Sequence, residues 1–287
     1  PDFDGHQVDW ANLGFGYMTT DYRYVANYKD GAWDKGGLTD DPTVTLNECA
    51  GIFHYCQEIF EGLKAYTTED GHIVTFRPDL NAVRMMDSAK RLEMPPFPAV
   101  GPYFKGGVHP LTICVSDFDR AAPHGTGHIK AGLNYAMSLY AIVDAHEKGF
   151  DENMYLDAAT RTYVEETGGA NFLFVTKDNK VVTPKSNSIL PSITRRSLMV
   201  VAKDYLGLEV EERPVAFEEV KDFAECGLCG TAAVISPVGK IVDHGKEICL
   251  PSGMTEMGPV TRKLYDTLTG IQMGRIEAPE GWIKVIE

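Results

Sequence analysis

The hydrophobic and polar positions in the first third of the chain predict strands and turns followed by one helix. Residues 22–29 alternate with a period of two, as in a half-buried strand, and end at the turn Asp30-Gly31. Residues 63–66 and 73–76 flank Glu69-Asp70-Gly71, which predicts a hairpin. A helix is then expected from Pro78 to the prolines at 95 and 96, because apolar side chains recur on one face: Val83, Met86, Ala89 and Leu92.

The rest of the chain mixes helices and strands. Residues 134–146 have the pattern of an amphipathic helix, and Ser192 is a suitable N-cap for a helix that runs to residue 206. Hairpins are predicted for residues 154–156 with 162–164 and for 171–176 with 181–183, and residues 232–235 predict a short buried strand. Pro and Gly are concentrated in residues 95–110, as in a linker. The pattern predicts two α+β domains, the smaller one first: residues 1–98, an interdomain loop at 99–109, and residues 110–287.

Composition agrees with a globular chain and excludes several classes of protein. Of 287 residues, 44% are hydrophobic and 24% are charged, which is close to the usual globular composition. The net charge of −14 repels phosphodiester backbones, so nucleic acid is not an expected partner. No apolar run approaches the roughly 20 residues of a membrane span, and no secretory signal is visible. We therefore expect a cytoplasmic chain with no membrane contact.

Six cysteines are too dilute for a disulfide scaffold. Cys226 and Cys229 form a C-x-x-C pair, but the sequence offers no second pair of ligands of the kind that a structural zinc site needs. No metal is expected. A redox pair stays open beside the simpler interpretation of two small thiols in a loop.

One lysine has an unusual context. Lys130 lies among small and apolar residues directly before a predicted helix, whereas Lys177 and Lys180 lie in charged surroundings. The segment 125–135 is neither a Walker loop nor a G-x-G-x-x-G fingerprint. A desolvated lysine has a lowered pKa and is a nucleophile near neutral pH. An ordinary surface lysine at a helix start fits the same pattern.

Three further segments have the chemistry of an anion or cofactor site. Residues 190–195 offer a Ser-capped helix start with N–H groups and hydroxyls, which suits a phosphate. Residues 229–233 form a turn of small residues whose backbone amides can approach an anion. Residues 163–171 place Glu165 and Glu166 before a Gly-Gly loop. The first and the last also fit ordinary roles, as a capped helix and a solvated turn.

Together these segments resemble, in order and spacing, a branched-chain-amino-acid aminotransferase, an enzyme of class IV and fold type IV that depends on pyridoxal 5′-phosphate. The resemblance covers nearly the whole chain and rests on residues 60–66, 76–78, 130–135, 166–171, 190–194 and 230–237. It implies the two-domain α+β fold of the D-amino-acid aminotransferase type. It also implies a homodimer whose active site lies near the subunit interface.

The resemblance implies roles for individual residues. Lys130 is similar to the Schiff-base lysine, which also shuttles a proton between Cα of the substrate and the cofactor. Glu166 is similar to the carboxylate that keeps the pyridine nitrogen protonated, so that the ring acts as an electron sink. Tyr135 resembles the phenol at the cofactor's ring oxygen. The other matches are the phosphate cup, Arg84, Ile193, Thr194 and Thr231, and the substrate site, Tyr55, Phe60, Tyr103, Thr231 and Ala232.

The reaction implied by the resemblance is transamination between leucine, isoleucine or valine and 2-oxoglutarate, which yields glutamate. Two alternatives share the lysine and the phosphate cup: a D-amino-acid aminotransferase and an aminodeoxychorismate lyase. Residues 60–66 and the long aromatic N-terminal extension favour the branched-chain enzyme. A nucleotide-binding module would need a glycine fingerprint that the sequence lacks, and a vitamin-binding protein would not need Glu166 at the ring nitrogen.

One departure from the family concerns the small domain. The family carries a Tyr-x-Arg-Pro phrase whose arginine receives the distal carboxylate of glutamate, whereas here residues 94–98 lead almost directly into residues 99–103. Burying that carboxylate without a cation is unfavourable. We therefore expect the native polypeptide to contain a further segment at the Pro98–Ala99 join.

Overall fold

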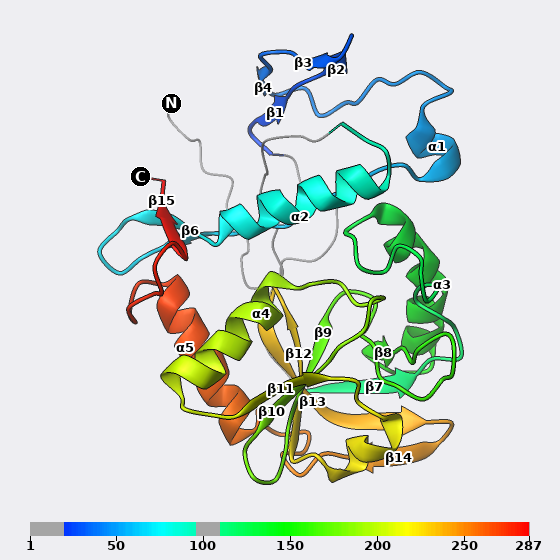
Figure 1. Cartoon of the computed structure of the whole chain (residues 1–287), viewed down its shortest axis with the longest axis vertical. Coiled ribbons are helices and arrows are strands. Elements are labelled where there is room, and N and C mark those ends of the chain that lie inside the picture. The colour runs from blue at the N-terminus through cyan, green and yellow to red at the C-terminus, as the bar shows by residue number, and fades with distance from the viewer. Residues whose placement is uncertain (1–19, 96–109, 287) are drawn as a thin grey trace.

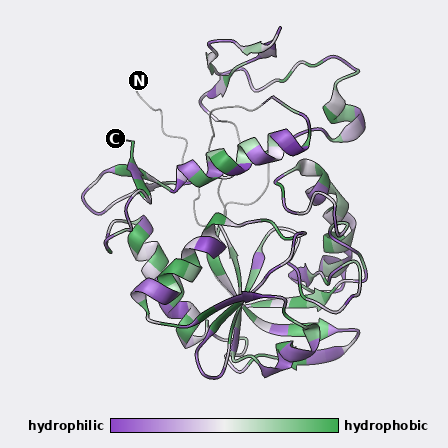
Figure 2. Ribbon diagram, viewed as in Figure 1, coloured by the Kyte–Doolittle hydropathy of each residue, from purple (hydrophilic) through white to green (hydrophobic). Residues whose placement is uncertain are grey.

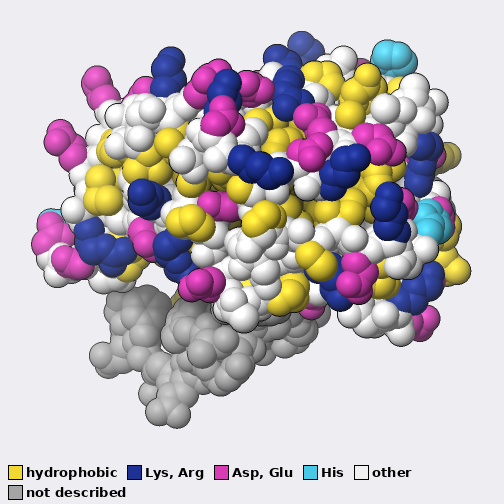
Figure 3. Space-filling view, turned by 90° about the horizontal axis from the view of Figure 1, so that it is seen from below, with side chains coloured by type: hydrophobic (Ala, Val, Ile, Leu, Met, Phe, Trp, Pro, Cys, Tyr) yellow, Lys and Arg dark blue, Asp and Glu magenta, His cyan; other side chains and the backbone are white. Residues whose placement is uncertain are grey.

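The computed structural model describes residues 20–95 and 110–286 (Figure 1). Tyr103, the Pro98–Ala99 join and the predicted interdomain loop at 99–109 lie outside the described residues. Among the residues that the structure describes, every helix is too short or too polar to cross a lipid bilayer. Figure 3 shows acidic and basic side chains interspersed over the lower face of the molecule, so that face has no field of a single sign.

One mixed eight-stranded sheet forms the body of the molecule. Its strands are β7 (Leu111–Val115), β8 (Glu152–Met154), β9 (Asn171–Val175), β10 (Val181–Pro184), β11 (Val210–Arg213), β12 (Glu225–Gly230), β13 (Val234–Asp243) and β14 (Lys246–Cys249). They follow the order β11-β10-β9-β12-β13-β7-β8, and β14 pairs with β13. The pairs β10–β11, β7–β13 and β7–β8 are parallel, and the others are antiparallel.

The two faces of this sheet form two separate cores. Leu173 and Val175 of β9 belong to one core, and the alternate residues Phe172 and Phe174 belong to the other. The first core packs under α4 (Ile193–Val200), the π-helical turn η1 (Val201–Tyr205) and α5 (Pro259–Gln272). The second core includes Val220 of η2 (Phe217–Asp222). Helix α3 (Gly132–Glu147) lies at the edge of the body away from α4 and α5 (Figure 1).

The smaller part of the molecule contains short strands and two helices. Its elements are β1 (Arg23–Val25), β2 (Tyr28–Lys29), β3 (Ala32–Trp33), β4 (Gly37–Thr39), α1 (Gly51–Tyr55), β5 (Ala65–Thr67), β6 (Ile73–Phe76) and α2 (Pro78–Arg91). Hydrophilic and hydrophobic residues alternate along α2 in Figure 2, as expected of a helix with one buried face.

The C-terminal strand returns to this smaller part. β15 (Ile283–Val285) pairs with β6 and completes a three-stranded sheet, β15-β6-β5. The ring of Trp282 lies edge-on to Phe76 at 5.4 Å, and the guanidinium of Arg77 lies 4.5 Å from the Trp282 ring. The predicted domain boundaries stay a prediction, but the end of the chain at residues 283–285 pairs with the small sheet rather than with the large one.

Most predicted elements are present. The structure contains the hairpins β5–β6 and β9–β10 and the helices α2, α3 and α4, and Ser192 caps α4, because its Oγ accepts a hydrogen bond from the Arg195 N–H (3.2 Å). The predicted strand over 22–29 is wrong as one element. It divides into β1 and β2, because the N–H of Asn27 donates to the Asp34 carboxylate (2.9 Å) instead of to a neighbouring strand.

The predicted pairing of residues 154–156 with 162–164 is present: Leu156 bridges Val164 in antiparallel fashion, and the N–H groups of Tyr155 and Asp157 donate to the carbonyls of Glu166 and Tyr163 (3.1 and 2.8 Å). Met154 also lies in β8, which pairs in parallel with β7. One further prediction needs correction. The strand predicted over 232–235 begins at Val234, because residues 231–233 form the turn between β12 and β13.

The C-x-x-C pair does not lie in a loop, as the simpler interpretation held. Both cysteines lie in β12 and are buried. Residues three apart in a strand point to opposite faces, and Cys226 belongs to the second core whereas Cys229 belongs to the first. Their thiols are therefore separated by the sheet itself, and a disulfide between them would require β12 to leave the sheet.

We expect activity to be insensitive to mild oxidants and reductants at this pair. Burial raises the pKa of both thiols, so neither is a reactive thiolate near neutral pH. A thiol reagent added to the native protein should label the three exposed cysteines, Cys49, Cys56 and Cys249, before Cys226 or Cys229. Peptide mapping of the labelled protein checks this, and rapid labelling of either β12 cysteine would contradict the buried geometry.

Candidate active site

The backbone of Lys130 is fixed by segments from both parts of the chain. Its N–H donates to Ser88 Oγ of α2 (3.1 Å), and its carbonyl accepts from the Phe60 N–H (3.2 Å). The side chain enters a cage of aromatic groups, in which Nζ lies 2.8 Å from the Tyr135 hydroxyl and 4.4 Å from the centre of the Phe60 ring. The rings of Phe60 and Tyr135 themselves meet edge to face at 4.8 Å. The lysine is thus held in one position within an apolar enclosure.

This enclosure changes the acidity of both polar groups. Burial, helped by the cations of Arg84 and Arg120, lowers the pKa of Lys130 to about 8, while Glu61 and Glu166 act in the opposite direction. Burial also raises the pKa of the Tyr135 phenol to about 12, so it stays protonated. Near neutral pH, Lys130 is therefore present as the neutral, nucleophilic amine to a greater extent than a lysine in water is.

Glu166 is a buried carboxylate that is fully hydrogen-bonded. Its Oε1 lies 2.8 Å from Arg120 Nη1 and accepts from the Leu190 N–H (2.8 Å), and its Oε2 accepts from the Asn171 side-chain amide (2.7 Å). Burial raises the pKa of Glu166 to about 7, and Arg120 opposes that rise. The carboxyl therefore sits near its ionisation point, with Arg120 favouring the charged form.

Arg120 is a residue that the sequence reasoning missed. Its side chain is 1% exposed, and besides Glu166 it donates to the carbonyls of Gly127 and Ser188 (3.3 and 3.1 Å). Its Nε has no partner among the described residues. The arginine links the segment before Lys130 to the loop that leads into α4. No local pattern marks it, because its role depends on a carboxylate far along the chain.

An anion cup lies at the N-terminus of α4. In its first turn the N–H of Arg195 donates to Ser192 Oγ and that of Arg196 to the Ser192 carbonyl (3.1 Å), whereas no acceptor from the described residues meets the N–H groups of Ile193 and Thr194. Such N–H groups and the helix dipole favour a bound anion. Thr194 and Thr231 line the same small cavity. The residues present fit a phosphate group.

Arg84 reaches this cup, but its charge is already balanced. Its Nη1 donates to the Pro191 carbonyl (3.3 Å), directly before the cup. Its Nε and Nη2 form a two-pronged pair with the carboxylate of Glu61, each at 2.7 Å, and the Glu61 side chain is 1% exposed. Glu61 therefore orients Arg84 and neutralises it locally.

Lys64 is a second lysine that the sequence reasoning missed. It lines the cavity with Thr194 and Thr231, and its Nζ donates to the Ala232 carbonyl. Burial lowers the pKa of Lys64, and no carboxylate among the described residues pairs with it. The side-chain oxygen of Gln272, in the same cavity, also lacks a described partner. The cavity thus carries an ammonium whose charge an incoming anion would balance.

The structure gathers most of the predicted site residues. Lys130, Tyr135 and Phe60 are in mutual contact, Glu166 and Arg84 are close enough to act on Lys130, and the cup follows at Ile193, Thr194, Thr231 and Ala232. Tyr55 has no contact with these residues in the structure: it ends α1, and the residue is 80% exposed. No group of His, Cys, Asp and Glu in the described part of the chain is arranged to hold a metal ion.

The family model and the sequence relatives that match this chain all belong to the aminotransferases. A family model described as amino-transferase class IV matches residues 97–241. A branched-chain-amino-acid aminotransferase of Haemophilus influenzae is 46% identical, with 98% of this chain and 99% of that protein covered, and one of Helicobacter pylori is 40% identical, with 96% and 97% covered. The Haemophilus alignment spans 341 positions, whereas this chain has 287 residues, so at least 54 of its positions have no counterpart here.

Solved structures agree with the sequence relatives. The branched-chain amino acid aminotransferase of Thermobaculum terrenum, in its pyridoxal phosphate form, superposes with a TM-score of 0.73 at 26% identity and covers 85% of this chain and 94% of its own. The described residues thus include a buried lysine, a buried carboxylate and a helix start with free N–H groups. The sequence relatives are named branched-chain-amino-acid aminotransferases. The chain belongs to the class IV aminotransferases and, among them, to the branched-chain-amino-acid aminotransferase family.

Proposed function

We propose that this enzyme transfers the amino group of leucine, isoleucine or valine to 2-oxoglutarate, with pyridoxal 5′-phosphate as cofactor. The observation that carries the proposal is the geometry around Lys130, whose Nζ lies 2.8 Å from the Tyr135 hydroxyl and whose pKa burial lowers to about 8. The buried carboxyl of Glu166, whose pKa rises to about 7, is near enough for its charge to act on the lysine. Such opposed shifts are typical of acid–base sites. The names of the relatives support the choice of amino acids.

Some residues of the chain would bind the cofactor, and others would transfer protons. When bound, the cofactor supplies a carbonyl for the amine and a ring that accepts electrons from Cα. Its phosphate fits the N–H groups of Ile193 and Thr194 with the hydroxyls of Thr194 and Thr231. Glu166 would hold a proton on the ring nitrogen, and Tyr135 would donate to the ring oxygen. Lys130 would bind the cofactor and move the proton at Cα of the substrate.

The substrate site combines apolar walls and cations. Phe60 is 41% exposed beside Lys130, so its ring offers an apolar surface to a side chain. The backbone amides of Thr231 and Ala232 suit the α-carboxylate, and Lys64 Nζ donates to the Ala232 carbonyl. The assignment of Tyr55 and Tyr103 to the walls of the substrate pocket stays a prediction.

The assay that tests the function supplies leucine and 2-oxoglutarate and measures glutamate. We expect glutamate to appear with leucine, isoleucine and valine. Glutamate from D-alanine instead would indicate the D-amino-acid aminotransferase, and release of pyruvate from aminodeoxychorismate would indicate the lyase. Binding of the cofactor with none of these reactions would reject an enzyme of this class.

Replacing Arg120 with Met should make the rate more sensitive to acid. Arg120 favours ionised Glu166, so its loss lets burial raise the pKa of Glu166 further, and the carboxyl is then protonated at pH 7. Each unit of rise lowers the ionised fraction at a fixed pH by up to about tenfold. We expect kcat at pH 7 to fall and to recover as pH rises. Breaking the buried pair should also lower the free energy of unfolding by about 3–5 kcal/mol.

A pH–rate profile and a denaturant titration measure both effects. The matched control is Arg161→Met, because Arg161 pairs with Asp119 at 3.2 Å on the surface and such pairs contribute about 1 kcal/mol or less. If the acidic limb of the profile stays in place in the Arg120 variant, Arg120 does not act through Glu166.

We further propose that the enzyme is a homodimer of the cytoplasm and that a segment at the Pro98–Ala99 join belongs to the native polypeptide. The excess of aligned positions in the Haemophilus relative supports the second point. Mass spectrometry of proteolytic peptides that span this join decides it. Further residues between Pro98 and Ala99 are expected, whereas a peptide in which Pro98 is followed directly by Ala99 would mean a true deletion and would require another cation, such as Lys64, for the distal carboxylate of 2-oxoglutarate.

A further inference from the structure

Gln272 carries a buried amide whose oxygen the fold leaves unpaired. The residue ends α5 and is 4% exposed, and its Oε1 has no hydrogen-bond partner among the described residues. A buried polar atom without a partner is destabilising, and native proteins rarely keep one unless a water molecule or a ligand pairs with it. The surroundings of Gln272 indicate what that partner is.

The amide lies in the wall of the small cavity at the anion cup. Thr194 and Thr231 line the same cavity, whose volume of about 10 Å³ is the room that one water molecule takes. So small a space brings the Gln272 amide close to any group that the two hydroxyls bind. Helix α4, whose N-terminus forms the cup, and helix α5 pack into the same core and lie side by side in Figure 1.

A phosphate at the cup would depend largely on neutral donors. The charge of Arg84 is already balanced by Glu61, at 2.7 Å, which leaves Lys64 as the cation that lines the cavity. A phosphate group offers three strong acceptor oxygens, and each of them accepts more than one hydrogen bond. The N–H groups of Ile193 and Thr194 and the threonine hydroxyls do not saturate these oxygens, so a further neutral donor has a place there.

The side chain of Gln272 can supply that donor. Its amide nitrogen carries two N–H groups, and a half-turn about the last side-chain bond exchanges the nitrogen and the oxygen. A bound anion favours the orientation in which the nitrogen faces the cavity. A hydrogen bond to a charged oxygen is also stronger than one between neutral groups. The anion would therefore pair an amide that the fold itself leaves without a partner.

We propose that Gln272 is a further binding residue for the phosphate of the cofactor, to which its side-chain N–H groups donate. The inference rests on the proposed function with pyridoxal 5′-phosphate and adds to it a residue from α5. The sequence reasoning did not single out this residue, because it lies 41 positions after Thr231 in the chain. The bound phosphate thereby joins the start of α4 to the end of α5.

The test compares pyridoxal 5′-phosphate with pyridoxal, which lacks the phosphate. Gln272→Leu removes the amide at nearly constant volume, whereas Gln272→Glu keeps the shape and places a negative charge at the cup. Titration of the full native chain, followed by the visible absorbance of bound cofactor, gives a dissociation constant for each compound. We expect Gln272→Leu to bind pyridoxal 5′-phosphate roughly 10- to 100-fold more weakly, the usual effect of losing a hydrogen bond to a charged group. Gln272→Glu should lose more, and neither variant should change the affinity for pyridoxal.

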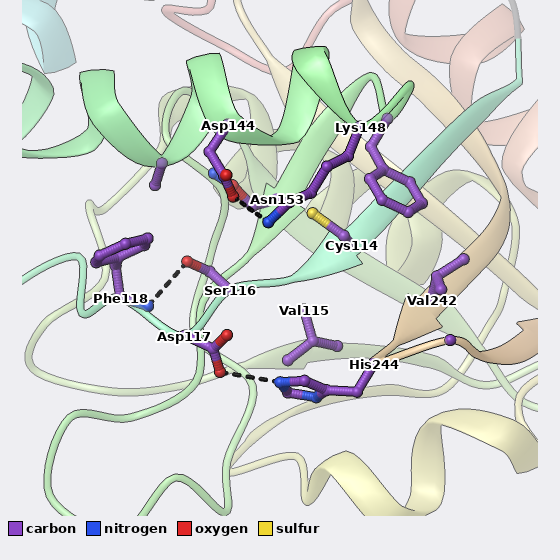
Figure 4. A pocket seen from close by; sticks show the side chains of 13 residues that line it. Cys114, Val115, Ser116, Asp117, Phe118, Asp144, Lys148, Asn153, Val242 and His244 are labelled. Carbon is purple, nitrogen blue, oxygen red and sulfur yellow. Dashed lines mark hydrogen bonds and ion pairs between the residues drawn. The ribbon is translucent and has the colours of Figure 1, made fainter.

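The stability of the cofactor-free chain separates a binding role from a structural one. Replacing an unpaired buried amide with an apolar side chain is neutral or stabilising, so cofactor-free Gln272→Leu should melt at or above the temperature of the parent. A structural role predicts a lower melting temperature. The matched control is Asn153→Leu, because Asn153 is 1% exposed and its Oδ1 also lacks a partner among the described residues. Asn153 lines a different hollow, of about 190 Å³, which Figure 4 shows, so its replacement should leave both affinities unchanged.

The outcomes separate the role of Gln272 from the proposed reaction. An unchanged affinity of Gln272→Leu for pyridoxal 5′-phosphate, or equal losses for the two compounds, overturns the assignment. The same loss in Asn153→Leu also overturns it, because the effect would then not belong to the cup. If Gln272→Leu fails to fold, the ratio of the two affinities in Gln272→Glu decides. A parent that binds pyridoxal 5′-phosphate but does not transaminate leucine counts against the reaction alone.

Discussion

Lys130→Ala is expected to abolish transamination of leucine, with a loss of about 10⁴-fold or more in kcat. The lysine supplies both the amine that binds the cofactor and the base at Cα, and loss of a general base alone costs up to about 10⁴-fold. The variant should also lose the visible absorbance band of lysine-bound cofactor, because no other described amine lies in this aromatic enclosure. Glutamate formation and an absorbance spectrum measure the two effects.

The control for this experiment is Lys177→Ala. Lys177 is exposed in the turn between β9 and β10 and should leave activity and spectrum unchanged. Reduction with borohydride gives a separate readout, since it fixes the cofactor to the amine that holds it. A Lys130→Ala protein that still yields a covalently reduced cofactor would move the role to another lysine, and Lys64 would be examined first.

Glu166→Gln should retain the cofactor and lose about 10²–10³-fold in kcat, the usual effect of removing one preorganised electrostatic partner. A neutral amide cannot hold the proton on the ring nitrogen, but the cup at Ile193, Thr194 and Thr231 is untouched. The substitution also leaves Arg120 without its carboxylate in a buried position. The melting temperature should therefore fall as well.

Glu165→Gln is the matched control, because Glu165 is a neighbouring buried carboxyl with different contacts. Its Oε1 accepts a hydrogen bond from the Ser186 hydroxyl (2.9 Å), and burial raises the pKa of Glu165. We expect a small effect on kcat once the protein is folded and loaded with cofactor, as determined from the absorbance of bound cofactor. Equal losses of kcat in the two variants would defeat the assignment of Glu166.

The sequence predicts those parts of the site that are local in the chain. Ser192 caps α4 as predicted, and the helix after Lys130 is present, because capping residues and apolar periodicity act over a few neighbouring positions. Arg120 and Lys64 were not predicted, because their roles depend on contacts that are distant in the sequence. Their partners, Glu166 and the Ala232 carbonyl, come from distant segments, and no local period reports which segments the fold brings together.

The cysteine pair is the opposite case: two residues that are close in the sequence are kept apart by the fold. A spacing of three residues suggests proximity for Cys226 and Cys229, and in a loop or a helix it would provide it. In β12 that spacing places the thiols on opposite sides of the sheet. Whether a short motif is reactive thus depends on the element that carries it.

The pairing of β15 with β6 has a consequence for the order in which the protein can fold during synthesis. The ribosome makes Phe76 long before its strand partner Ile283. Nascent domains generally fold from the N-terminus onward. Here the small sheet of β5 and β6 keeps an unpaired edge until β15 has been synthesised, and such edges favour aggregation. Polysomes carrying this chain should therefore depend on chaperones that shield exposed strands.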